Sequence, residues 1–173
     1  IPGVANSGSV TAANSSQTTD GAASNLIMSK EACEKYGVKP KVKLLGYVVA
    51  GCKPDEMGVG PKYAIPLLFK KTGMTMDKII KDGIIELNEA FASQGIHCAR
   101  ELGIGDPKYF EFGSKDLIIN PTGGAIALGH PLGCTGSKIF ATLVNNMQRM
   151  GKKYGVESMC IGGGMGAAAL FEL

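Results

Sequence analysis

Apolar residues follow two different spacings along the chain, and these spacings predict alternating strands and helices. Short runs rich in Val, Leu and Ile are typical of strands, whereas apolar residues three and four positions apart are typical of helices. The predicted strands cover residues 42–51, 83–87, 117–120, 155–161 and 167–173. The predicted helices cover residues 61–71, 90–102 and 135–150, and an earlier one ends at Gly37. This alternation indicates an α/β fold with helices on the faces of a sheet.

The last two predicted strands are joined by a turn that contains Gly162, Gly163 and Gly164. Because this connection is too short for a helical crossover, the two strands should be antiparallel. The other strands are separated by helices, which is typical of parallel pairs. We therefore expect a layered α/β fold with a mixed, mainly parallel sheet flanked by helices.

Composition limits the classes of partner. The chain has 173 residues, enough for one full domain and part of another. Its net charge is only +3 and its lysines are scattered, so no nucleic acid is expected as a partner. No apolar stretch reaches the roughly 18 residues of a membrane span, so no membrane partner is expected. Five cysteines without a CxxC pair favour reduced thiols inside a cell.

One thiol, Cys160, stands directly before three glycines. Glycines let a ligand approach the backbone closely and expose its N–H groups, which favours a reactive site. The alternative is a packing role, because buried free cysteines are common. Gly162, Gly164 and Ala167 also satisfy GxGxxA, but a dinucleotide site needs a helix after this motif, and here a strand follows. A nucleotide site is therefore excluded.

Two other segments each carry one polar group in an apolar or glycine-rich setting. Asn88 follows the predicted strand 83–87, and the carboxyl ends of such strands are where open α/β sheets bind ligands. His130 lies within the glycine-rich segment 123–136. Asn88 could instead cap a helix, and His130 could be structural. Together with Cys160, the two residues suggest one composite pocket, whereas His97 lacks such surroundings and is interpreted as structural.

Three motifs occur in the order and at the spacing found in thiolases. They are NEAFA at residues 88–92, GGAIALGHPLGCTG at 123–136 and CIGGGMG at 160–166. The chain resembles the degradative, peroxisomal kind of 3-ketoacyl-CoA thiolase over nearly its whole length. This resemblance implies thiolytic cleavage of 3-ketoacyl-CoA by free CoA, or the reverse Claisen condensation. Acyl-CoA and CoA would be the partners, CoA would act as a substrate, and no metal or cofactor is expected.

The resemblance also implies roles for single residues. His130 would activate the nucleophilic thiol and, with a water held by Asn88, stabilise the enolate oxygen. Cys160 would be the acid and base for the substrate α-carbon or the CoA thiol. The N–H of Gly162 would help form a second oxyanion hole. Two further residues, Ser16 and Phe91, match positions that touch the pantetheine arm of CoA.

The sequence departs from the family in one respect. Thiolases form an acyl-enzyme on a cysteine in a setting like CSSG, and none of the five cysteines here has that setting. The resemblance therefore implies that residues 1–19 end a loop domain, 20–40 form the last strand and helix of the N-terminal domain, and 41–173 form the C-terminal domain. We expect this chain alone to be inactive.

The full-length protein should be a homodimer or tetramer. We expect it in the peroxisome, with the mitochondrion and the cytosol as alternatives. Two other functions stay open: a non-catalytic acyl-CoA-binding or assembly module of the same fold, and a ketoacyl synthase. A synthase would usually present histidine in place of Cys160, which argues against the second. Residues 1–21, rich in Ser, Thr, Ala, Asn and Gly, read as a flexible arm when taken alone.

Overall fold

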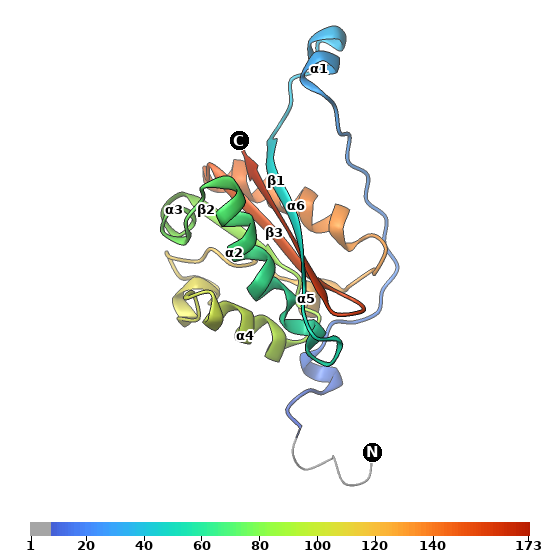
Figure 1. Ribbon diagram of the computed structural model, residues 1–173, viewed down its shortest axis with the longest axis vertical. Coiled ribbons are helices and arrows are strands. Elements are labelled where there is room, and N and C mark those ends of the chain that lie inside the picture. The colour runs from blue at the N-terminus through green and yellow to red at the C-terminus, as the bar shows by residue number, and fades with distance from the viewer. Residues whose placement is uncertain (1–7) are drawn as a thin grey trace.

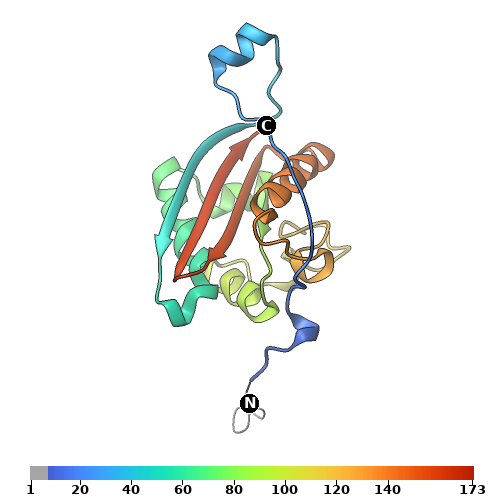
Figure 2. The same ribbon diagram turned by 90° about the vertical axis from the view of Figure 1, so that its right-hand side faces the viewer.

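A computed structural model describes residues 8–173 and shows a four-stranded sheet with helices on both faces (Figures 1 and 2). The strands are β1 (Lys43–Gly51), β2 (Gly83–Leu87), β3 (Tyr154–Ile161) and β4 (Met165–Glu172). The α-helices are α1 (Lys30–Tyr36), α2 (Gly60–Thr72), α3 (Met76–Asp82), α4 (Ala92–Glu101), α5 (Ala125–Leu128) and α6 (Thr135–Met150). The three short 3-10 helices are η1 (Ala12–Asn14), η2 (Pro54–Val59) and η3 (Pro107–Tyr109).

The strand order is β1-β4-β3-β2, with β2 parallel to β3 and β4 antiparallel to both of its neighbours. The expected layered α/β fold with a mixed sheet and flanking helices is confirmed. The expectation of a mainly parallel sheet needs correction. Strands β1, β2 and β3 do point the same way, but the tight glycine turn places β4 directly beside β3 and so between β3 and β1. Two of the three pairings are therefore antiparallel.

The predicted strand over residues 117–120 is wrong as an extended element. It is reduced to one bridge, in which Ile119 pairs with Ile85 at the outer edge of β2. Asn120 donates its N–H to the carbonyl of Ile85 and has a φ of 46°, in the left-handed region. That conformation turns the chain away from the sheet, so the pairing ends after a single contact.

The stretch between the arm and α1 forms no strand in the described part of the chain. Leu26 and Ile27 lie in no regular secondary structure and are 81% and 88% exposed, and the helix ends at Gly37 as expected. The division into residues 1–19, 20–40 and 41–173 stays a prediction, and its first seven residues lie outside the described range.

Two clusters of apolar side chains hold the layers together. Helices α2 and α4 cover one face of the sheet and α6 covers part of the other (Figures 1 and 2). Successive side chains of β2 point to opposite faces of the sheet, so this strand contributes to both clusters. Ile85 packs toward α2 and α4, whereas its neighbour Ile84 packs against Leu143 and Met147 of α6. Both clusters consist of buried residues with partly buried side chains packed against them, and they fix the carboxyl ends of β2 and β3 at one edge.

Helix α2 begins in direct backbone contact with β4. A Cβ added to Gly60 would lie 2.7 Å from the Cα of Gly166, and one added to Gly166 would lie 2.7 Å from the Cα of Gly60. Real Cβ atoms do not approach other atoms this closely. Only two glycines can therefore occupy this crossing.

Candidate active site

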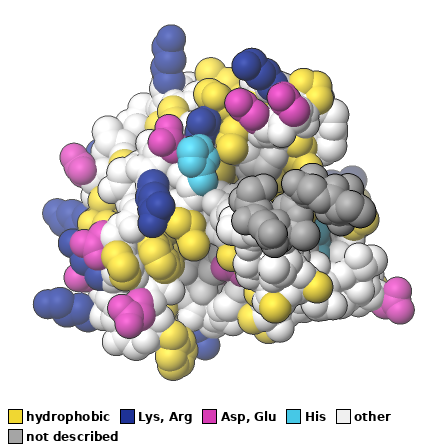
Figure 3. All heavy atoms as spheres, turned by 90° about the horizontal axis from the view of Figure 1, so that it is seen from below, with side chains coloured by type: hydrophobic (Ala, Val, Ile, Leu, Met, Phe, Trp, Pro, Cys, Tyr) yellow, Lys and Arg dark blue, Asp and Glu magenta, His cyan; other side chains and the backbone are white. Residues whose placement is uncertain are grey.

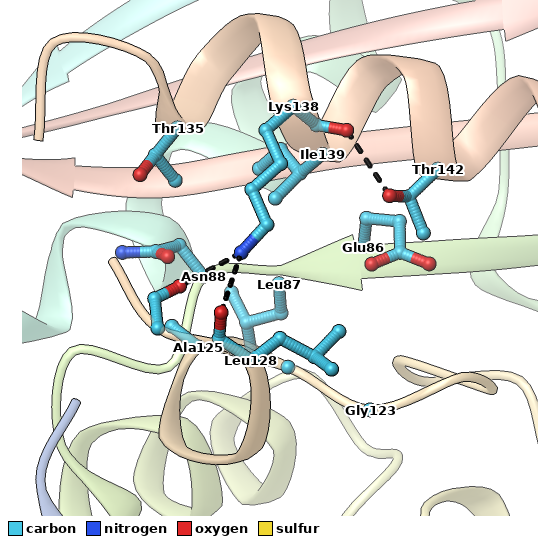
Figure 4. A pocket seen from close by; sticks show the side chains of 12 residues that line it. Glu86, Leu87, Asn88, Gly123, Ala125, Leu128, Thr135, Lys138, Ile139 and Thr142 are labelled. Atoms are coloured by element: carbon cyan, nitrogen blue, oxygen red, sulfur yellow. Dashed lines mark hydrogen bonds between the residues drawn. The ribbon is translucent and has the colours of Figure 1, made fainter. Parts of the chain in front are cut away.

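Asn88 lies at the carboxyl end of β2, as the sequence predicts. Its N–H donates to the carbonyl of Ser158 on β3 at 2.9 Å, which extends the parallel ladder by one residue. Its side chain is only 2% exposed and lies close to α6 (Figure 4). The strand end thus holds the carboxamide at a fixed point of the sheet edge.

His130 is brought to Asn88 from a segment 42 residues away. The Asn88 Nδ2 and the His130 Nε2 are 3.3 Å apart, and the His130 Nδ1 lies 2.6 Å from the hydroxyl of Thr135. That hydroxyl donates its only hydrogen to the carbonyl of Pro131 at 3.0 Å, so it must accept from an Nδ1–H. This network assigns the Nδ1–H tautomer and leaves a lone pair on Nε2.

The environment of His130 keeps the imidazole neutral. Burial lowers its pKa below the ordinary value, and the positive charge of Lys138 lowers it further. At neutral pH the ring is therefore unprotonated at Nε2. In this tautomer the Nε2 lone pair accepts the 3.3 Å hydrogen bond from the Asn88 Nδ2. A thiol that displaces this long hydrogen bond can give its proton to Nε2.

The other side-chain atom of Asn88 lacks a partner. Its Oδ1 is buried and makes no hydrogen bond to any described residue. Buried polar atoms in folded proteins are nearly always hydrogen-bonded, and an exception calls for a water or a ligand donor. Asn88 can therefore accept one further hydrogen bond next to His130.

Cys160 lies at the same edge, two residues beyond the Ser158 that binds Asn88. Within the described chain, no hydrogen bond joins its thiol to Asn88 or His130. Burial is the main cause that raises the pKa of the Cys160 thiol, and the nearby thiol of Cys52 adds to it. The N–H groups of a glycine turn would lower the pKa of a neighbouring thiol, but here desolvation of the thiolate outweighs the favourable backbone contact.

The glycine turn itself has an open and a closed part. A Cβ added to Gly162 would meet no atom within 4 Å, so a ligand can approach its backbone. Gly164 has a φ of 93°, and an added Cβ there would lie 2.5 Å from the carbonyl oxygen of Cys52. Gly164 therefore anchors the turn, and Gly162 is the accessible position.

The arm joins the other two candidate residues to this site. The N–H of Ser16 donates to the carbonyl of Ala90 at 2.9 Å, and Ser15 pairs with Phe91 in an antiparallel bridge. Further along, Thr18 pairs with His130, whose N–H donates to the carbonyl of Gln17 at 2.9 Å. Residues 15–18 are thus fixed across both segments of the site, which corrects the expectation of a flexible arm for this part.

Sequence reasoning missed three residues that hold the site. The amide of Asn120 bonds both the N–H and the carbonyl of Leu87, at 2.8 and 2.9 Å, and also donates to Glu89 at 2.7 Å. Glu89 in turn accepts the N–H of Ile126 at 3.4 Å. The third residue is Thr135. The only sequence signal for Thr135 is its place in GHPLGCTG. The role of Asn120 depends on a left-handed turn that the sequence does not reveal.

Comparison with known proteins agrees with this geometry. Residues 38–173 match the sequence profile of the family described as "Thiolase, C-terminal domain". The chain belongs to the thiolase family. It is 50% identical over 166 residues to a 3-ketoacyl-CoA thiolase of Bacillus subtilis, covering 96% of this chain and 39% of that protein. It is 48% identical over 172 residues to the peroxisomal 3-ketoacyl-CoA thiolase of Homo sapiens, covering 99% and 38%.

Solved thiolase structures share the fold. Human mitochondrial 3-ketoacyl-CoA thiolase superposes with a TM-score of 0.80 at 38% identity, over 94% of this chain and 38% of that one. The same human enzyme in complex with CoA gives a TM-score of 0.73 at 41% identity, over 83% and 33%. This thiolase chain therefore spans about two fifths of the length of the relatives that it matches.

Several classes of site have no counterpart in residues 8–173. No helix there is both long and apolar enough to cross a membrane. No cluster of His, Cys, Asp and Glu side chains among these residues is arranged to hold a metal ion. On the face shown in Figure 3, basic and acidic side chains are interspersed, and no continuous basic patch forms on it.

A pair of carboxyl groups, that of Glu86 buried and that of Glu157 half-buried, lies behind the site of the thiolase chain. Glu86 on β2 and Glu157 on β3 are direct partners in the parallel ladder. Glu86 accepts a hydrogen bond from Asn146 at 3.1 Å. Burial raises the pKa of Glu86 to about 7 and that of Glu157 to about 8, and repulsion from Glu86 contributes to the latter. The two groups therefore favour the protonated state near neutral pH.

This pair should make the thiolase chain less stable in mild alkali. Both folded-state pKa values lie above the ordinary 4.5, so their stabilising contribution is present at low pH and is lost as pH rises toward about 8. We expect the free energy of unfolding to fall by a few kcal/mol between pH 6.5 and 9, as the size of the shifts implies. Glu157→Gln should flatten this decline, and urea unfolding across that range measures it. Glu34→Gln, on the exposed face of α1, is the matched control, and an equal decline in E157Q would contradict the assignment.

Proposed function

We propose that this thiolase chain supplies the His130 and Asn88 part of the active site of an acyl-CoA C-acyltransferase. The reaction would cleave 3-ketoacyl-CoA with CoA to acetyl-CoA and an acyl-CoA two carbons shorter, or run as the reverse Claisen condensation. One observation carries the proposal: the neutral imidazole presents the lone pair of Nε2 beside the carboxamide of Asn88, whose Oδ1 is buried without a partner. The relatives named 3-ketoacyl-CoA thiolase support it.

In this mechanism His130 acts first. Its Nε2 removes the proton from a nucleophilic thiol, which then attacks the ketone carbonyl of the substrate. The imidazolium formed now carries an Nε2–H, which can donate to the oxygen on which negative charge develops. A water bound to Asn88 would be the second donor. Each such pre-placed donor is typically worth about 3 kcal/mol of transition-state stabilisation.

Cys160 is suited to the next proton transfer. Because its pKa is raised, it carries a proton at neutral pH and can deliver it to the α-carbon of the leaving acetyl-CoA as the carbon–carbon bond breaks. The resulting thiolate is a strong base in this buried setting. It can recover a proton from the incoming CoA thiol, whose sulfur then attacks the acyl-enzyme, while the N–H of Gly162 would bind the oxygen of that thioester. The bond from the acyl carbon to the nucleophilic thiol breaks, and the released thiolate takes back the proton held by His130.

The substrate and the cellular setting complete the proposal. Ser16 and Phe91, joined through the arm, would contact the pantetheine portion of CoA, which acts as a substrate without any cofactor. We assign the parent enzyme to fatty acid β-oxidation in peroxisomes and to a homodimer or tetramer, on the strength of its peroxisomal relatives. A complex of CoA with the human mitochondrial neighbour supports CoA as the ligand.

The decisive experiment compares this chain with a chimera. The chain alone should release no acetyl-CoA from acetoacetyl-CoA and CoA above the uncatalysed rate, because no cysteine in it stands in the nucleophile setting. Joined to the N-terminal region of the Bacillus subtilis relative, it should give enzyme-like thiolysis. An active isolated chain would contradict the inactivity. A chimera that folds and binds CoA without turnover would contradict the enzyme assignment and favour an acyl-CoA-binding module.

A further inference from the structure

Lys138 stands one turn after Thr135 in α6, and no motif assigned it a role. Its side chain reaches back from the helix across the small cavity that Asn88, Glu86 and Gly129 help to line (Figure 4). The Nζ donates to the carbonyl of Gly129 at 2.8 Å and to that of Leu128 at 3.3 Å. It thereby ties the end of α5 to the start of α6, on either side of the segment that carries His130.

The position of the Gly129 carbonyl makes this tie important. That carbonyl belongs to the same peptide unit as the N–H of His130, and a peptide unit is rigid and planar. Lys138 holds the oxygen end of this unit, while the His130 N–H at the other end donates to Gln17. Thr135 fixes the far side of the imidazole at Nδ1. Together with Asn88 at Nε2, four contacts therefore hold the backbone and the ring of His130, and the one from Lys138 carries a charge.

The charge of Lys138 is also one of the few near the imidazole. Burial is the larger cause that lowers the pKa of His130, and the ammonium of Lys138 is the second. The carboxyl groups of Glu86 and Glu157 on the neighbouring strands are not among the causes that shift the pKa of His130. Burial is the main cause that raises their own pKa values. Residues 15–18 of the arm, which pack on His130 from the other side, contain no charged side chain.

We propose that Lys138 is a positioning residue for the acyl transfer: it locks the Gly129–His130 peptide and keeps a positive charge beside the imidazole. The catalytic meaning of this role rests on the function proposed above. The geometric role can be tested without substrate, because it concerns only the orientation and protonation of His130 in this chain.

The test is an NMR titration of the two imidazoles in the complete chain, combined with hydrogen exchange of the His130 amide. In Lys138→Met the pKa of His130 should rise, and its amide should exchange about tenfold faster, as expected when a charge-assisted hydrogen bond is lost. In Lys138→Arg, both the pKa of His130 and the exchange rate of its amide should stay at the wild-type values. Lys138→Gln, which keeps a donor but no charge, should raise the pKa and largely keep the slow exchange.

Internal controls make the outcome decisive. His97 reports any general change, and Lys152→Met removes a half-buried lysine whose side chain bonds only the carbonyl of Lys81. Wild-type values for His130 in K138M would overturn the proposal. If K138M does not fold, K138Q decides, since an unchanged pKa for His130 in that variant overturns the charge role. Neither result depends on thiolysis, so a failure of the proposed function would be seen separately.

Discussion

His130→Ala is expected to lower kcat for thiolysis by about a thousandfold in the chimera with a relative's N-terminal region. The variant removes both the base at Nε2 and the donor formed from it, effects that are typically worth about a hundredfold or more each but are not fully additive. Binding of CoA should change little, because the side chain contacts Asn88 and Thr135 in the structure. Steady-state rates with acetoacetyl-CoA measure the effect.

The control for this variant is His97→Ala, which removes the only other histidine of the chain. His97 contacts Lys62 on α2, away from Asn88, so its loss should change kcat no more than about twofold. The pH profile gives a second check: because the pKa of His130 is lowered in the free chain, the acidic limb of kcat/KM should lie below the ordinary histidine value. A kcat in H130A within tenfold of the parent would contradict the role of the imidazole.

Gly166→Ala is expected to cause the largest loss of stability among single substitutions in the sheet. The added methyl group would overlap the backbone of Gly60, which cannot move without displacing the start of α2 from β4. Overpacking typically costs 1–3 kcal/mol and more where backbone must shift, so we expect about 3 kcal/mol or more. In a chain of this size, that corresponds to a fall in Tm of roughly 10 °C. Thermal unfolding followed by circular dichroism measures it.

Gly51→Ala provides the matched comparison on the neighbouring strand. Gly51 pairs with Met165, next to the row of Gly166, yet a Cβ added to it would meet nothing within 4 Å. This variant should therefore have a Tm equal to or slightly above that of the parent chain. Equal Tm values for G166A and G51A would show that the contact between α2 and β4 is not tight.

Sequence could predict the parts of the site that depend on short motifs. Asn88 follows a strand that periodicity identifies, and its place at the strand's carboxyl end follows from the general geometry of α/β sheets. The glycines around His130 mark a segment that can approach another loop closely. From these two facts the meeting of Asn88 and His130 could be anticipated, and the structure brings them to 3.3 Å.

Other features could not be predicted, because they depend on which strands become neighbours. The pairing of Glu86 with Glu157 joins residues 71 positions apart and exists only because β2 lies beside β3. The pairing of β1 with β4 likewise follows from packing that no local pattern encodes. The direction of the pKa shift at Cys160 reflects how deeply the strand end is buried, which the glycines beside it do not reveal.

The pairing of residues 15–18 with both Phe91 and His130 has a dynamic consequence. Residues 15–18 are hydrogen-bonded to two loops that are otherwise separate, so neither loop can open fully until these hydrogen bonds break. Opening of the two loops should therefore be cooperative: amide protons of Ser16 and His130 should exchange with one shared free energy. Entry of a long thioester and release of its products would then depend on one cooperative opening of both loops at the edge of the sheet.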